Sequence, residues 1–208
     1  MSRALIYGAS GDLAQAVTAA FQGRDWTVDE VTRDADLTAY SDYRPKGLHD
    51  AYVFPQAVFL KKPLAETTDA EIDAVIGVGL TEIAKCLRNL LAIPAPLDQR
   101  LDYCIIGSTS AYAGFKDTAL YCAAKHGLVG LVRALNDEYA STGRRFWLFS
   151  MGTMDTQMGR LLADQDPTSF LPPQAVAERI VEAVTAPSNL FESEVVIRRR
   201  TIRFKDRP

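Results

Sequence analysis

Short runs rich in β-branched and aromatic residues alternate with longer helical segments along the chain. ALIY, YCII and RRFWLFS are such runs, and DLAQAVTAAFQG is a segment whose apolar residues recur at helical spacing. Strands separated by helices form βαβ units, whose right-handed crossovers put helices on both faces of a parallel sheet. With 208 residues, 48% of them hydrophobic, the chain can bury a core on both faces. The sequence therefore predicts a single α/β domain over residues 1–208, a Rossmann-like doubly wound parallel β-sheet.

Charge and composition exclude several functional classes. The formal net charge of −3 gives no general attraction for nucleic acid or an anionic membrane surface. We find no apolar segment long enough for a signal peptide or a membrane span. The three cysteines have no CxxC spacing, and His49 and His126 have no partners at metal-ligand spacing. We expect a cytoplasmic protein with reduced thiols, without a metal site and with neither nucleic acid nor membrane as a partner.

The turn YGASGDLA follows the first apolar run directly. Gly8, Gly11 and Ala14 take the spacing of a dinucleotide fingerprint, in which small residues permit a sharp turn and close approach to a diphosphate. The diphosphate would sit at the positive end of a helix beginning near Asp12. Glycine-rich turns also serve structure alone. The placement between a strand and an amphipathic helix favours a dinucleotide site, and we expect it to include Gly8, Ser10, Gly11, Asp12 and Leu13.

The end of the second predicted strand bears on the choice of dinucleotide. In VTRDAD, Arg33 competes with Asp34 and Asp36. An acidic residue here binds the ribose 2′-hydroxyl of NAD, whereas an arginine accommodates the 2′-phosphate of NADP. We interpret Arg33 as favouring NADP, with NAD as the alternative.

A predicted helix over residues 119–140 carries Tyr121 and Lys125 one turn apart, on the same face. Ser108 follows the buried run YCII, at the carboxyl end of a strand, where open α/β sheets bind ligands. A nearby ammonium favours the phenolate and lowers the pKa of a tyrosine, and a serine hydroxyl can hydrogen-bond the same substrate oxygen. The alternative is a rim tyrosine beside a snorkelling lysine.

Taken together, these motifs resemble those of the short-chain dehydrogenase/reductase family. YGASGDLA resembles its cofactor turn, IIGSTSAY the segment of its serine, YCAAK its YxxxK pair, and KKPLAETTDAEIDAVIGVGL the segment forming its fourth helix. The resemblance implies that Tyr121 is the acid/base, that Lys125 binds ribose hydroxyls and lowers the tyrosine pKa, and that Ser108 orients the substrate. SMGTMDT resembles the family segment that lies along the nicotinamide and its phosphates, which implies cofactor contacts from Gly152, Thr153, Met154 and Thr156.

Several positions depart from the family pattern. FPQA replaces the Asn-Asn-Ala-Gly segment, so contacts on the adenosine side must differ, and we expect Gln56 among them. Gly79 stands where the family has the asparagine that supports a proton-relay water, and Met151 replaces a proline. The span from Thr32 to Ala51 is short enough that a helix and a strand of the family pattern are shrunken or absent.

Two functions from different classes are consistent with these features. The first is an oxidoreductase that transfers a hydride between NADP(H) and a ketone or secondary alcohol of a small to medium organic substrate. The second is a dinucleotide-binding sensor or scaffold with little or no turnover, which Gly79 and FPQA favour. The apolar helices at 68–91 and 119–140 predict a homodimer or homotetramer through these segments. The basic segment 198–207 is interpreted as a solvated or subunit-contact tail.

Overall fold

The computed structural model describes residues 1–33, 39–186 and 191–205. A sheet of parallel strands in the order β2-β1-β3-β4-β5-β6 forms the centre of the molecule. Its strands are β1 (Arg3–Tyr7), β2 (Thr27–Val31), β3 (Ala51–Phe54), β4 (Leu101–Ile106), β5 (Arg144–Met151) and β6 (Glu194–Ile197). The helices between them are α1 (Asp12–Gln22), α2 (Asp69–Ile76), α3 (Glu82–Leu91), α4 (Ala119–Glu138) and α5 (Pro173–Thr185).

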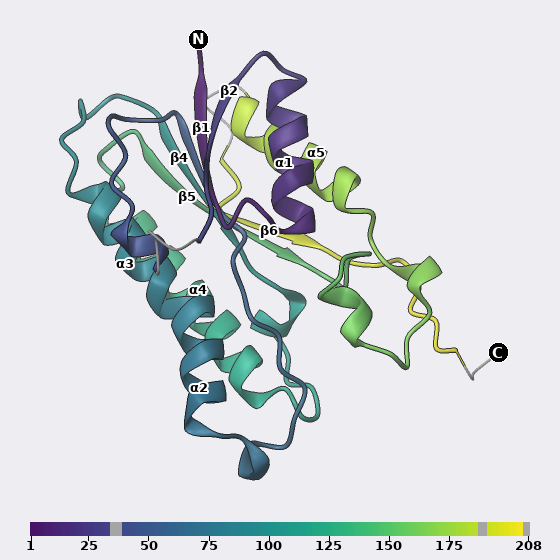
Figure 1. Ribbon diagram of the computed structural model, residues 1–208. Helices are drawn as coiled ribbons and strands as arrows, with labels where there is room; N and C mark the ends of the chain where they lie inside the picture. Colours follow the sequence, from purple (N-terminus) through teal and green to yellow (C-terminus); the bar gives the residue numbers. More distant parts are fainter. Residues whose placement is uncertain (34–38, 187–190, 206–208) are drawn as a thin grey trace.

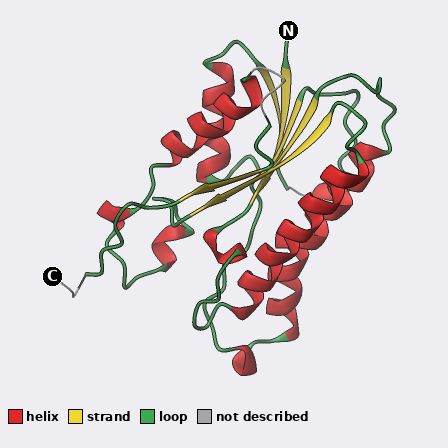
Figure 2. Cartoon of the chain, turned by 180° about the vertical axis from the view of Figure 1, so that it is seen from behind, coloured by secondary structure: helices red, strands yellow, loops and turns green. Residues whose placement is uncertain are grey.

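Helices cover both faces of the sheet, as the two views in Figures 1 and 2 show. Helices α1 and α5 lie on one face, and α2, α3 and α4 lie on the other. Each strand divides its side chains between two cores. In β4, Cys104 joins the core under α1 and α5, whereas its neighbours Tyr103 and Ile105 join the core under α3 and α4. The predicted doubly wound parallel sheet is confirmed.

The predicted helix over residues 68–91 is not one regular α-helix. Thr68 caps α2 through a capping box with Glu71, as its side chain accepts a hydrogen bond from the Glu71 backbone. A π-helical turn, η3 (Gly77–Thr81), then separates α2 from α3. At Gly79 the turn packs against α4 so closely that a Cβ on this glycine would lie 3.4 Å from the Cβ of Ala124. The expectation is corrected: an irregular turn interrupts the segment beside α4.

The connection between β2 and β3 contains a short 3-10 helix, η1 (Tyr40–Asp42). Residues 34–38 of this connection lie outside the described part of the chain, so the shortening of the N-terminal half stays a prediction. None of the helices within residues 1–33, 39–186 and 191–205 is both long and apolar enough to cross a bilayer.

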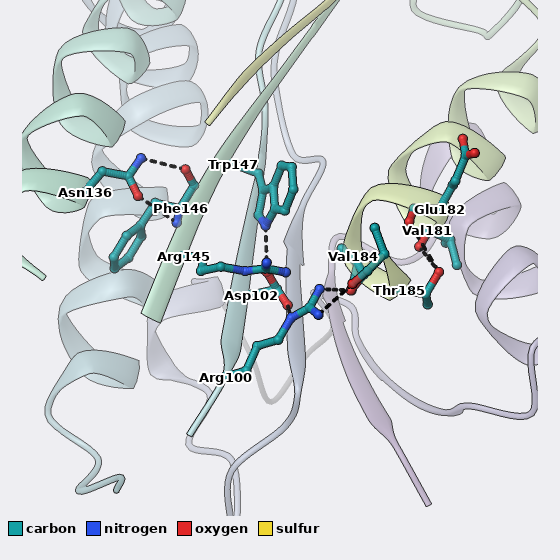
Figure 3. A network of polar contacts seen from close by, with 11 residues as sticks. Arg100, Asp102, Asn136, Arg145, Phe146, Trp147, Val181, Glu182, Val184 and Thr185 are labelled. Carbon is teal, nitrogen blue, oxygen red and sulfur yellow. Dashed lines mark hydrogen bonds and ion pairs between the residues drawn. The ribbon is translucent and has the colours of Figure 1, made fainter. Parts of the chain in front are cut away.

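A buried carboxylate joins three parts of the fold near the amino ends of β4 and β5 (Figure 3). Asp102 accepts hydrogen bonds from the Arg100 guanidinium at 2.9 Å, from Arg145 at 2.8 Å and from the Trp147 indole at 2.6 Å. Arg100 also donates to the carbonyl groups of Val184 and Ala186 at the end of α5. The network therefore attaches α5 to the sheet at the edge opposite the carboxyl ends of the strands.

Replacing Asp102 tests this network. Asp102→Asn keeps the shape of the side chain and removes the charge that compensates two guanidinium groups. We expect the free energy of unfolding to fall by about 3 kcal/mol, because breaking a buried ion pair leaves an uncompensated charge. Urea denaturation followed by circular dichroism measures the change. Asp98→Asn, in an exposed loop, is the matched control, and equal stability of the two variants would contradict this role of Asp102.

Candidate functional site

One cavity of about 1190 Å³ opens at the carboxyl ends of the central strands. The turn after β1, the segment after β3, the Ser108 segment after β4, the segment after β5 and one face of α4 border it. Every residue predicted for the site lines this cavity, namely Gly8, Ser10, Gly11, Asp12, Leu13, Arg33, Gln56, Ser108, Tyr121, Lys125, Gly152, Thr153, Met154 and Thr156. The structure thus brings the whole predicted set together, while the role of each residue stays a prediction.

The turn after β1 depends on glycine at its first position. Gly8 has a φ of 65°, in the left-handed region that favours glycine. Its N–H donates to the Val31 carbonyl at 2.8 Å, and the Tyr40 hydroxyl would lie 3.3 Å from a Cβ at this position. Gly11 is the N-cap of α1 and provides no side-chain cap, so the first turn of the helix presents N–H groups without a side-chain acceptor there. Such a helix end suits an anion.

The segment after β5 is attached to this helix start. The Gln157 N–H donates to the Asp12 carboxylate at 2.6 Å. Backbone hydrogen bonds with Leu171, in which Leu171 donates to Thr153 and Asp155 donates to Leu171, hold the same segment from the other side. These bonds fix the predicted phosphate-contacting segment opposite the start of α1.

Gln56 is a buried side chain without partners among the described residues. It is 6% exposed, and both its amide nitrogen and its amide oxygen lack hydrogen bonds. Buried polar groups are nearly always paired in folded proteins. Because Gln56 lines the cavity beside Gly8, a polar ligand that offers a donor and an acceptor would satisfy it. This observation fits a bound dinucleotide.

Arg33 also faces the cavity. Its guanidinium lies over the ring of Tyr40, with 5.1 Å between Cζ and the ring centroid, so the ring and the charge stabilise each other. Asp34 and Asp36, the two competing acidic residues, lie outside the described residues. The structure therefore places an arginine in the cavity wall just after β2. The preference between NADP and NAD stays a prediction.

Gly107, the residue before Ser108, packs closely against β5. A Cβ at Gly107 would come within 2.5 Å of the Ser150 Oγ in β5, so only glycine fits there. The Gly107 N–H continues the sheet by donating to the Phe149 carbonyl at 2.8 Å. Ser108 then starts the short 3-10 helix η4 (Thr109–Ala111), and its Oγ accepts a hydrogen bond from the Ser110 N–H at 3.1 Å.

Tyr121 and Lys125 reach the same region from α4. The Ser108 side chain lies close enough to the Tyr121 phenol to lower its pKa, and the Tyr121 ring meets Phe59 edge to face at 5.0 Å between centroids. Lys125 is 1% exposed, and its Nζ donates to the Ile106 carbonyl, at the end of β4, at 2.8 Å. An ammonium has three N–H donors, so Lys125 can bind a further acceptor.

The expected lowering of the tyrosine pKa is wrong for this structure. Burial raises the pKa of Tyr121, and the nearby Ser108 side chain opposes this only in part. The reason is the position of Lys125, whose Nζ lies 5.7 Å from the centroid of the Tyr121 ring and donates to a backbone carbonyl. Burial also lowers the pKa of Lys125 to about 8. At neutral pH the phenol is therefore protonated and the lysine is mostly charged.

Sequence reasoning missed one wall of the cavity. Arg198, Arg199, Ile202 and Phe204, assigned to a solvated or subunit-contact tail, line the cavity, although Arg198, Ile202 and Phe204 are also exposed to solvent. Their segment runs beside the loop after β5 (Figure 1), where the Asp166 N–H donates to the Arg203 carbonyl at 2.8 Å. Ile202 and Phe204 alternate with polar residues in TIRFK, and this alternation was the available signal for an extended segment.

Metal ligands are not gathered in this region. Within the described ranges, no group of three His, Cys, Asp or Glu side chains could hold a metal ion.

A family profile and a curated oxidoreductase match the sequence of this chain. Residues 10–185 match the family profile described as enoyl-(acyl carrier protein) reductase. An uncharacterised oxidoreductase of Staphylococcus aureus strain MW2 is 31% identical over 108 residues, which are 51% of this chain and 46% of that protein. The match therefore spans about half the length of this relative.

Two solved structures share the fold at low sequence identity. An alcohol dehydrogenase from the archaeon Thermococcus sibiricus, complexed with 5-hydroxy-NADP, superposes with a TM-score of 0.79 at 19% identity, covering 100% of this chain and 99% of that one. A short chain dehydrogenase family protein from Francisella tularensis gives a TM-score of 0.80 at 16% identity, with coverage of 95% and 96%.

The depressed pKa of Lys125 predicts a specific pH dependence of stability. Between about pH 8 and 10.5 the unfolded chain keeps a proton that the folded chain has lost, so rising pH favours the folded state. From pH 8 to 9.5 the free energy of unfolding should rise by about 1.5 kcal/mol relative to that of Lys125→Met, which lacks the titrating group. Urea denaturation of both proteins at each pH gives the difference. Parallel pH curves would contradict the buried ammonium.

Proposed function

Because this chain belongs to the short-chain dehydrogenase/reductase family, we propose that it transfers a hydride between NADP(H) and a ketone or secondary alcohol of a small to medium organic substrate. One observation carries the proposal. Ser108, Tyr121 and Lys125 border the same cavity as the glycine turn after β1 and the segment after β5. A purely structural tyrosine would not need a neighbouring serine and a buried ammonium beside a glycine turn of dinucleotide-binding spacing.

NADP would be held by residues from four loops. Gly8, Ser10, Gly11, Asp12 and Leu13 would border its diphosphate, Arg33 its 2′-phosphate, Gln56 the adenosine side, and Gly152, Thr153, Met154 and Thr156 the nicotinamide end. When bound, the reduced cofactor supplies the hydride for the carbonyl carbon. The buried, unpaired amide of Gln56 supports this assignment because it needs a polar partner in the cavity.

Side chains of the protein would bind the substrate oxygen and supply its proton. With its raised pKa, the Tyr121 phenol keeps its proton at neutral pH and can donate it to a carbonyl oxygen during reduction. Ser108, which lines the same cavity as Tyr121, can bind the same oxygen and orient it. Lys125, whose ammonium has N–H donors left beyond its bond to the Ile106 carbonyl, would bind the ribose hydroxyls of the cofactor.

A sensor or scaffold that binds the dinucleotide without turnover is the second candidate. Gly79 favours it, because this buried position in η3 has no side chain to hold a relay water. The two functions differ in one measurable respect, which is turnover after cofactor binding.

Replacing the phenol tests the first function directly. A panel of aldehydes and ketones is assayed with NADPH and NADH for loss of the reduced cofactor. We expect Tyr121→Phe to lower kcat by roughly 100- to 10,000-fold, since a positioned acid is lost, while the Kd for NADPH, measured by fluorescence, stays within about twofold.

Tyr139→Phe removes a hydroxyl outside the cavity and is the matched control for Tyr121→Phe. Tight NADPH binding by the wild type without turnover of any carbonyl would favour the sensor.

Arg33 provides a test of the cofactor preference. We expect Arg33→Ser to raise the Kd for NADPH by roughly tenfold or more, because hydrogen bonds to a charged group are lost. The Kd for NADH should hardly change, since NADH has no 2′-phosphate, and it serves as the internal control. Equal changes for both dinucleotides would show that Arg33 does not recognise the 2′-phosphate.

We propose, in addition, that two or four copies associate through α2, α3 and α4. The outward face of α4 carries the small exposed residues Ala123, Gly130 and Ala134, which would allow another helix to approach closely.

A further inference from the structure

We propose that Arg199 is an anion-binding residue of the cavity, where it holds either a carboxylate of the substrate or the diphosphate of the dinucleotide. The inference rests on the proposed function and adds a recognition site on the C-terminal segment, outside the family motifs described above. Its ligand class follows from charge and hydrogen-bonding capacity.

The guanidinium of Arg199 is oriented but not neutralised. Its Cζ lies over the Phe170 ring at 5.4 Å from the centroid. The chain of Arg199 passes beside Gly152, since its Cγ and Nε would lie 3.7 and 3.8 Å from a Cβ there. The aromatic ring and the backbone of residue 152 therefore hold the side chain along the cavity wall.

One nitrogen of this group is buried without a partner. Nη1 of Arg199 has no hydrogen bond, and no carboxylate among residues 1–33, 39–186 and 191–205 forms an ion pair with Arg199. Burial lowers the pKa of Arg199, which reflects the cost of desolvating the charge. Such a cost is tolerated where a ligand supplies the missing acceptor.

The other charged residues that line the cavity also favour an anionic ligand. Six basic residues line it against two acidic ones, although the whole chain carries a net charge of −3. The basic residues are Arg33, Lys61, Lys116, Lys125, Arg198 and Arg199, and the acidic ones are Asp12 and Asp117. A concave surface with an excess of one charge concentrates ligands of the opposite charge.

Equilibrium binding measurements distinguish the two possible ligand groups, the dinucleotide diphosphate and a substrate carboxylate. NADPH is titrated by fluorescence into the wild type, Arg199→Met and Arg199→Lys. For the substrate arm, 2-oxobutanoate, 3-oxobutanoate and 4-oxopentanoate and their methyl esters are titrated calorimetrically into NADP⁺-saturated protein, in which no hydride is available and binding is measured without turnover. Arg200→Met removes the same charge from an exposed neighbour outside the cavity and is the matched control.

A diphosphate contact predicts that Arg199→Met raises the Kd for NADPH by roughly 10- to 100-fold, the usual effect of losing hydrogen bonds to a charged group. A substrate contact predicts the same factor for a keto acid, with no change for its ester or for NADPH. In both cases Arg199→Lys should recover part of the affinity, because it keeps the charge but not the planar fork.

The proposal is overturned if Arg199→Met binds NADPH and all three keto acids as Arg200→Met does. Thermal unfolding of each variant checks that the cavity wall is intact; if Arg199→Met unfolds early, the comparison rests on Arg199→Lys, whose unchanged affinities would equally overturn it. Failure of the proposed oxidoreduction is a separate result, seen as wild-type protein that binds NADPH but reduces no carbonyl.

Discussion

The hydrogen bond between the buried ammonium of Lys125 and the carbonyl of Ile106 joins the helix that carries Tyr121 to the strand that precedes Ser108. It connects the second turn of α4 to the last residue of β4, and no carboxylate takes part in it. Desolvating an ammonium is expensive, so the rest of the structure must hold α4 firmly enough to keep this single partner in place. Ser108, two residues after Ile106, and Tyr121, one turn before Lys125, are then fixed relative to each other. Tyr121 is thus positioned by a helix, and Ser108 lies directly after a strand, and such regular elements are more precise supports than loops.

Much of this arrangement could be predicted because parallel strands end at a common edge. Knowing that β1, β3, β4 and β5 are parallel is enough to bring Gly8, Gln56, Ser108 and Gly152 around one space. The prediction failed where the outcome depends on packing. The charge state of Tyr121 follows from burial and from the direction of the Lys125 side chain, and neither is visible in the YCAAK spacing. The π turn around Gly79 depends on contact with Ala124, a residue 45 positions away, which periodicity cannot reveal.

Two of the departures from the family pattern lie on the side of the cavity formed by β3 and η3. Gln56 brings an unpaired amide to the segment after β3, and Gly79 removes a side chain from the turn beside α4. Both changes leave Ser108, Tyr121 and Lys125 untouched. They alter the polar groups around the cavity and not the three side chains proposed to react.

The wall formed by residues 198–205 is built differently from the rest of the site. Its attachment to residues 164–166 uses backbone groups, through the Asp166–Arg203 and Lys205–Asp164 hydrogen bonds. Backbone hydrogen bonds of this kind do not depend on which side chains the residues carry. The residues that line the cavity from this strip can therefore be exchanged with little penalty to folding, which makes the strip a practical starting point for engineering a new selectivity while Ser108, Tyr121 and Lys125 stay as they are.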